Sequence, residues 1–343
     1  MRVSSNVTYN DFIKNLGTNA SKVQKTLNQL SSLKEVSQSS DNPLLVAKIM
    51  NLNVSLAKNT TYGQEIKDSQ DWINTEFSAL KGVNDSMNNI RRLVQHSANG
   101  TQDIDEIKAN RNEIQQEIQG IVEALNTNFD GRYIFGGTNT TKPPFEVSRD
   151  ADGNVNGIIY AGSQTEVSRE IADNASIDLP TNGGKLIGGR VDGNGQANGS
   201  DMNDFFTSLM DDMNFYIENK ERLSTIDRSS LDPAIPADQA VLNDLNRFDK
   251  WAVNMSNNIS KVDNLKNSIS DFQTQIDAIA NRLKSAGERN EADKLSLTST
   301  LSERQDVDVA EKYMEYQNQM LAYQATMSMG TKIMQTSILD YVR

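Results

Sequence analysis

The chain has 343 residues, enough for two or three domains, but only 36% are hydrophobic and 6% aromatic, which favours a rod or bundle with narrow apolar seams over one thick core. The net charge of −12 argues against binding to nucleic acid or to an anionic membrane surface. The absence of cysteine excludes disulfides and thiolate metal sites.

The N-terminal ten residues carry one arginine and otherwise mix Val, Ser, Asn and Thr. They lack the apolar segment of a cleavable secretory signal, so any export is expected to follow another route. The sequence also has no run of about 18 apolar residues, and we therefore expect no membrane-spanning helix.

A helical stripe opens the chain, because apolar residues recur at steps of three and four. Polar residues 37–42 break this helix, and Asn42 followed by Pro43 is typical of a helix N-cap and first turn. The stripe consists of Ile13, Leu16, Ala20, Val23, Leu27 and Leu30.

A longer helix is predicted over residues 61–99, where Ile66, Ile73, Leu80, Met87 and Val94 lie seven apart. The triplet at 99–101, Asn-Gly-Thr, is a stop signal. Another stripe follows from 104 to 125, so two long helices joined by a short turn suggest an antiparallel pair.

The sequence changes character after the segment 132–137 (Arg-Tyr-Ile-Phe-Gly-Gly). Strands are predicted at 145–148, 155–160, 167–171 and 176–179, separated by turn dipeptides such as Asp152-Gly153. Residues 183–200 are rich in Gly, Asn and Asp and predict a loop. A helix capped by Asp201 follows, and Pro233 and Pro236 end this region.

The last block is helical again. From Phe248 to Leu283 apolar residues alternate at three and four for about five heptads, and Gly287 allows a break. The final helix has a seam of Tyr and Met. We expect residues 13–30 to meet 313–334, and the helices of 66–125 to pack with 248–283.

The C-terminal seam has two interpretations, which are packing within one chain and packing against neighbouring copies; both can hold in different states. The positions that we expect to form the assembly interface are Ile13, Leu16, Val23, Leu27, Leu30, Tyr313, Tyr316, Met320, Tyr323, Met327, Met334, Ile338 and Leu339.

Motifs for catalysis and for ligand binding are weak. His96 is the single histidine and is expected to be a solvated helix residue, because a lone His cannot build a usual zinc site. The sequence around Asp150 fits a hairpin turn better than a calcium loop. Residues 183–189 do not fit a phosphate-binding loop. We therefore predict no catalytic residue, metal site or cofactor.

Several segments resemble the flagellin-type proteins of the bacterial flagellum. Residues 39–43 (Ser-Ser-Asp-Asn-Pro) are similar to the polar break of that family, although its usual glycine is absent. Residues 130–138 (Asp-Gly-Arg-Tyr-Ile-Phe-Gly-Gly-Thr) with Pro144-Phe145 resemble the hook-filament junction branch, the hook-associated protein 3 type. Segments of residues 306–341 resemble the flagellin-type C-terminus. The likeness covers about 1–142 and 240–343.

The resemblance implies a structural, non-enzymatic protein that is exported through the flagellar type III apparatus without a cleaved signal. Its implied partners are further copies of itself in a ring-like oligomer, another hook-associated protein, flagellin, and a cytosolic export chaperone on the C-terminal region. Filament flagellin itself is the alternative within this class. An enzyme carried by the insert and a signalling coiled coil are alternatives from other classes.

The expected fold class is mainly α: an elongated helical rod or coiled coil formed by the N- and C-terminal segments, with a small central β-rich insert. Residues 1–42 with 302–343 are expected to form the terminal coiled-coil region. Residues 43–142 with 237–301 are expected to form a helical rod domain, and 143–236 the variable insert.

Overall fold

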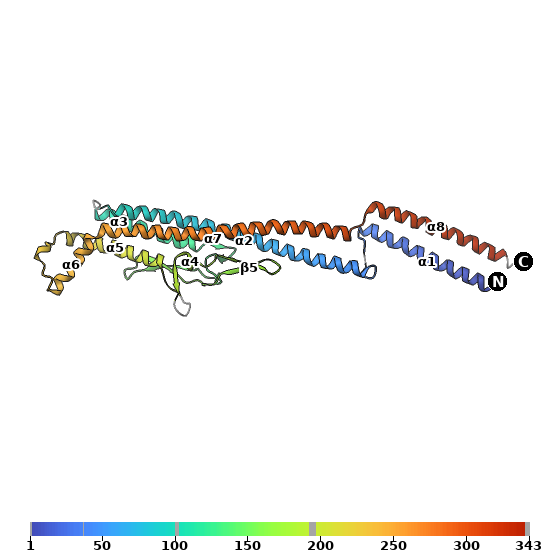
Figure 1. Ribbon diagram of the computed structural model, residues 1–343, viewed down its shortest axis with the longest axis horizontal. Helices are drawn as coiled ribbons and strands as arrows, with labels where there is room; N and C mark the ends of the chain where they lie inside the picture. The colour runs from blue at the N-terminus through green and yellow to red at the C-terminus, as the bar shows by residue number, and fades with distance from the viewer. Residues whose placement is uncertain (1, 37, 100–102, 192–196, 340–343) are drawn as a thin grey trace. The chain divides into compact units, whose positions relative to one another are not determined.

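The computed structural model describes residues 2–36, 38–99, 103–191 and 197–339, with the side chains in these ranges except 2–6, 190–191, 197–198 and 333–339. Helices at both ends flank a set of short β-hairpins (Figure 1), which confirms the predicted mainly α fold class. The helices are α1 (Arg2–Ser32), α2 (Pro43–Ser97), α3 (Ile104–Leu125), α4 (Gly183–Leu186), α5 (Asp201–Ser224), the 3-10 turn η1 (Arg228–Ser230), α6 (Pro236–Asp249), α7 (Trp251–Gln305) and α8 (Val309–Leu339).

The strands form four separate antiparallel pairs. They are β1 (Asn128–Phe129) with β2 (Arg132–Tyr133), β3 (Phe145–Arg149) with β4 (Val155–Tyr160), β5 (Val167–Ala172) with β6 (Ala175–Leu179), and β7 (Gly189–Val191) with β8 (Ala197–Ser200).

The chain divides into two compact units. The first comprises Met1–Thr61 with Arg289–Arg343, and the second comprises Tyr62–Glu288. Helices α2 and α7 contribute residues to both units. The three-part division expected from the sequence stays a prediction.

The core of the second unit is built on the heptad positions of α2. Ile66, Ile73, Leu80, Met87 and Val94 are each at most 2% exposed, as their seven-residue spacing predicts for a buried seam. They pack in one cluster with apolar residues of α3, α5, α7 and the hairpins. The period of the sequence therefore identifies the buried face of this helix.

Helix α2 runs antiparallel to α3 and to α7. Near the end of α2, the Ser97 hydroxyl accepts a 2.9 Å hydrogen bond from Asn110 of α3, and the Ser97 carbonyl accepts one of 3.0 Å from Trp251 of α7. Further along α7, Asp263 pairs with Arg91 at 2.7 Å. The predicted antiparallel pairing of the helices is thus confirmed within this unit.

The segment Ile134–Gly137 holds the insert together. Ile134 and Phe135 are fully buried. The Gly137 amide donates to Thr181 O at 2.9 Å. Its φ of 63° favours glycine, because a residue with a Cβ is strained at a positive φ. The Tyr160 hydroxyl donates to the Phe135 and Ser163 carbonyls, and burial raises its pKa to about 12. The motif that resembled the junction branch is thus a structural hub.

A stack of three aromatic rings fixes the end of the second unit. Tyr216 of α5 lies between Phe248 of α6 and Trp251 of α7, with ring centroids 5.0 and 4.2 Å apart. Arg247 pairs with Asp211 and Asp212 of α5 at 2.7 and 3.0 Å. These contacts tie α5 to the region where α7 begins.

The structure differs from the sequence-based interpretation in three places. Residues 183–200 are not one loop, because α4, β7 and β8 form there. The pair β1–β2 was not predicted. Gly287 does not break α7, which continues to Gln305; a Cβ at Gly287 would sit 3.6 Å from Ile66 and Gln70, an ordinary contact distance, so packing does not require glycine there.

The expected turn at 99–101 lies partly outside the described residues. Helix α2 ends at Ser97, and α3 begins with a capping box in which Asp103 and Glu106 each accept from the backbone. The hairpin turn predicted around Asp150 is confirmed, because its carboxylate accepts from the amides of Asp152 and Asn154 at 3.0 and 2.8 Å.

Candidate assembly surface

Helices α1 and α8 pack side by side within the first unit (Figure 1). Polar side chains bridge them at two levels: Thr26 donates to Gln319 at 2.7 Å, and Asn19 donates to Thr326 at 2.9 Å. At a third level Phe12 packs against Gly330, where an added Cβ would overlap the ring. These contacts fix one antiparallel register for the two helices, which we call the terminal pair.

A short antiparallel backbone bridge closes the terminal pair where α1 ends. The Glu35 amide donates to Gln305 O at 2.8 Å, and the Val307 amide donates to Leu33 O at 3.3 Å. Lys34 pairs with Asp306 at 2.7 Å. This bridge holds together the two connections that lead from the terminal pair to α2 and α7.

Charged side chains surround the bridge. The hydrogen bond from Lys34, with a second one from Ser302, lowers the pKa of Asp306. Burial works to lower the pKa of Lys312, but its hydrogen bonds to Glu35 and Glu315 outweigh burial and raise it. Both shifts favour the charged form, the carboxylate of Asp306 and the ammonium of Lys312.

The predicted seam residues fall into three groups. One group is half-buried between the helices: Leu16, Val23, Leu30, Tyr316, Met320 and Tyr323. A second group is exposed although it belongs to the predicted stripe: Ile13, Leu27, Tyr313 and Met327. The side chains of Met334, Ile338 and Leu339 lie outside the described residues.

Helix α8 is apolar on more than one side. Beyond the predicted seam, Met314, Leu321 and Met329 are 61%, 61% and 65% exposed. A helix that is apolar around its circumference is normally buried on all sides. In the isolated chain α1 covers only part of α8, so the terminal pair presents an apolar surface that a partner can cover.

This wider surface is what sequence reasoning missed. The seam was read from one stripe with a period of three and four, which selects a single face. The signal that could have found the rest is the apolar content of α8 outside that stripe, where Met314, Leu321 and Met329 occur.

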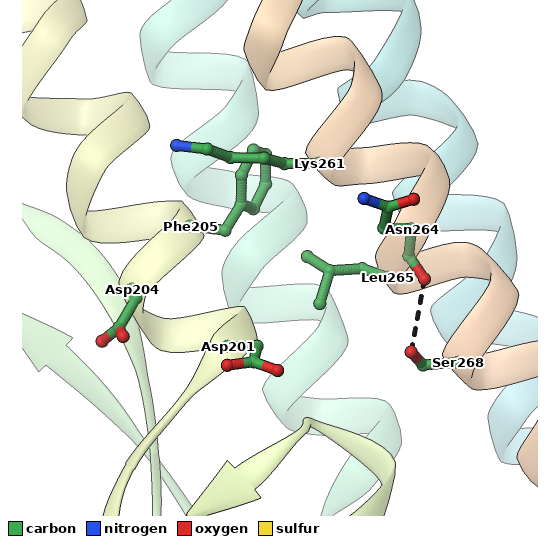
Figure 2. Close-up of a pocket in the computed structure, with 7 residues that line it drawn as sticks. All are labelled: Asp201, Asp204, Phe205, Lys261, Asn264, Leu265 and Ser268. Carbon is green, nitrogen blue, oxygen red and sulfur yellow. Dashed lines mark hydrogen bonds between the residues drawn. The ribbon is translucent and has the colours of Figure 1, made fainter.

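A groove in the second unit lies between the start of α5 and the first third of α7 (Figure 2). Its volume is about 300 Å³, and it is lined by Asp201, Asp204 and Phe205 of α5 and by Lys261, Asn264, Leu265 and Ser268 of α7. The Ser268 hydroxyl donates to the Asn264 carbonyl at 3.3 Å. The lining lacks a nucleophile activated by a base, so its geometry offers no catalytic arrangement.

His96 lies exposed near the end of α2, with its Nδ1 atom 3.4 Å from the amide nitrogen of Asn110. Among the residues that the structure describes, no group of three His, Cys, Asp or Glu side chains could hold a metal ion. Within the same described ranges, no helix has the length and apolar character needed to cross a bilayer.

Comparison with known proteins gives one family match. Residues 3–140 match the family described as the bacterial flagellin N-terminal helical region. Flagellar hook-associated protein 3 of Escherichia coli strain K12, and its namesake in Salmonella typhimurium strain LT2, are each 23% identical to this chain over 192 residues. The match covers 54% of this chain and 57% of each relative, so the chain spans little more than half the length of these relatives.

A solved structure supports the fold. A protein from Vibrio parahaemolyticus, provisionally described as flagellar hook-associated, aligns with a TM-score of 0.50 and 17% identity. The alignment covers 78% of this chain and all of that one. Taken together, these matches confirm the resemblance inferred from the sequence: this chain is similar to the flagellin-type hook-associated proteins, and its residues 3–140 match the flagellin N-terminal helical region.

Proposed function

We propose that this protein is a structural component of the bacterial flagellum, which acts at the junction between hook and filament and has no enzymatic activity. The observation that carries the proposal is the apolar surface of the terminal pair, above all on α8. Burying such a surface against neighbouring subunits is favourable by roughly 25 cal/mol for each Å² removed from water. The relatives named as flagellar hook-associated protein 3 support the same role.

The partners follow from this proposal. Further copies of the chain cover α8 in a ring-like oligomer, while another hook-associated protein and flagellin contact the ring on its two sides. Before assembly, a cytosolic export chaperone shields the C-terminal region, because an apolar helix surface is prone to aggregate. The protein works outside the cell and leaves through the flagellar type III apparatus without losing a signal. No nucleic acid or membrane takes part.

A double variant of α8 tests the proposal. Leu321→Gln with Met329→Gln removes exposed apolar side chains, and the second unit should keep its fold because neither residue lies in it. The control replaces two exposed polar residues of the same helix, Asn318→Gln with Gln324→Asn. In a strain that lacks its own copy of the gene, the control should restore motility and the apolar-to-polar variant should not. Equal motility with both would contradict the proposed role of α8.

Filament flagellin is the second candidate, because residues 3–140 match the helical region that names that family. Seeded polymerisation separates the two. The proposed junction protein adds a short segment to hook seeds and stops, whereas a flagellin continues into long filaments. Long filaments of purified protein would replace the proposal by the alternative.

A further inference from the structure

The first unit contains a second pair of helical segments besides the terminal pair, and these segments also have exposed apolar faces. Residues 43–61 of α2 lie beside residues 289–305 of α7, and buried Asn59 and Asn290 fix their register by donating to each other's carbonyls at 3.0 and 2.9 Å. We call this arrangement the α2/α7 segment. The reciprocal amide bonds leave little freedom for one helix to slide along the other.

Each helix of the α2/α7 segment turns an apolar residue outward. Met50 and Val54 are 62% and 57% exposed, one turn apart on α2, whereas Ile49 and Asn59 are buried. With about 100° between successive residues, Val54 lies on the face opposite that inner seam. Leu295 of α7 is 73% exposed and lies on the corresponding outer face of its helix.

Each outer face carries one charged residue a turn away from its apolar residue, a cation on α2 and an anion on α7. Residues 43–61 contain two lysines, Lys48 and Lys58, and no acidic residue. Lys58 follows Val54 by one turn, so the two share a face. On α7, Glu291 precedes Leu295 by one turn, and both are exposed. One face therefore presents an apolar residue beside a cation, and the other presents an apolar residue beside an anion.

We infer that the α2 face of the α2/α7 segment packs against the α7 face of a second copy of this chain. The two helices are antiparallel, so equal offsets before Asn59 and after Asn290 lie at the same level. Val54 lies five residues before Asn59 and Leu295 five residues after Asn290, while Lys58 directly precedes Asn59 and Glu291 directly follows Asn290. A parallel copy placed alongside at the same level thus sets Val54 opposite Leu295 and Lys58 opposite Glu291. In that register these two pairs match, while Met50 lies opposite Ser299.

The contact joins two different faces, so it is heterologous and each copy keeps one face open for the next. Copies that meet at one level close into a ring if the rotation between them closes. The inference deepens the proposed function and rests on it for the assembled state, because it names which faces neighbouring copies share in the ring-like oligomer.

Cysteine cross-linking tests the contact, since the chain has no cysteine of its own. Val54→Cys and Leu295→Cys variants, made in the full chain, are co-expressed in a strain that lacks its own gene, and sheared flagella are oxidised mildly. A disulfide needs Cα atoms roughly 4.4–6.8 Å apart, so only close opposition will join them. We expect covalent dimers with both variants together, and none with either variant alone.

Matched controls and a charge exchange sharpen the result. Ser55→Cys with Asp293→Cys is a pair of exposed positions that lies away from the two outer faces, and it should give no dimer. Within the Val54 and Leu295 pair, Lys58→Glu alone should lower the dimer yield about two- to five-fold, and Glu291→Lys added to it should restore the yield.

The outcomes separate the contact from the function. If the chain is present in sheared flagella but Val54→Cys and Leu295→Cys give no mixed dimer, the contact is wrong and the proposed function stands. Dimers of Val54→Cys alone would also overturn it, because they indicate a symmetric contact. If the chain is absent from flagella, the proposed function fails. The contact is then tested by oxidising the two cysteine variants together in the concentrated secreted fraction, and it holds only if the mixed dimer forms there.

Discussion

Glu76 gives the sharpest prediction about stability. Its side chain is fully buried on α2, and one carboxyl oxygen accepts a 2.9 Å hydrogen bond from the Trp72 indole. In the described part of the chain, the other oxygen has no hydrogen-bond partner. Burial raises the pKa of Glu76 well above its ordinary value, although the Trp72 bond opposes the shift, and the nearby charge of Glu166 adds to it.

The sign of the pH dependence follows from that shift. The folded state holds the Glu76 proton more tightly than the unfolded state does. The stability that this protonation contributes is therefore fully present below pH 4.5, and it is lost as the pH rises towards the folded pKa of Glu76. In that window one proton is exchanged on unfolding, so the free energy of unfolding falls by up to about 1.4 kcal/mol per pH unit. Glu76→Gln keeps an acceptor for Trp72 but cannot ionise, so it should lack this slope.

Urea unfolding followed by tryptophan fluorescence measures the effect, because the two tryptophans, Trp72 and Trp251, both lie in the second unit. With a urea dependence of about 1.5–3 kcal/mol per M, 1.4 kcal/mol moves the midpoint by roughly 0.5–1 M. At pH 8 Glu76→Gln should be the more stable protein. The exposed Glu146→Gln serves as control and should follow the wild type. If the free energies of unfolding of Glu76→Gln and of the wild type changed in parallel as the pH was raised from 4.5 to 8, the reasoning would be refuted.

Three further substitutions probe the fold. Gly330→Leu should drive the added side chain into the Phe12 ring and raise the rate of proteolysis within α1; an unchanged rate would show that the terminal pair does not pack in this register. Gly137→Ala should lower the free energy of unfolding by about 2–4 kcal/mol in urea, because its φ is positive and the added Cβ would overlap two carbonyls. Gly153→Ala, with a positive φ but open space around it, should cost about 1 kcal/mol in the same assay. Equal costs would argue against the structural role of Gly137. Leu80→Ala, at a fully buried position, should cost roughly 2–5 kcal/mol by the same assay, and a cost below 1 kcal/mol would place Leu80 outside the core.

The helices were predictable wherever one apolar period ran unbroken. The seven-residue spacing from Ile66 to Val94 defines a buried face without further information, and the structure buries all of it. Hairpin β3–β4 was also predictable, because Asp152-Gly153 separates two alternating segments. In both places local sequence and tertiary packing favour the same structure.

The misses have a shared physical cause, which is that tertiary contacts outweigh local preference. Gly287 costs α7 about 1 kcal/mol of helix propensity, but the burial of its neighbours Leu283 and Ala286 in the core favours a continuous helix. Strands β7 and β8 have no apolar alternation, so nothing local announces them. On the candidate surface, a single stripe identified Tyr316 and Met320 but not the outer faces of α8.

The central claim, a structural protein at the junction of hook and filament, is tested most directly by its position on the flagellum. Asp152→Cys places a single thiol on the exposed turn between β3 and β4, in a chain without other cysteines. Isolated flagella from cells that make this variant can be labelled with a thiol-reactive gold particle and viewed by electron microscopy. The account predicts one short band of label between hook and filament. Label along the whole filament, or none on the flagellum, would contradict it.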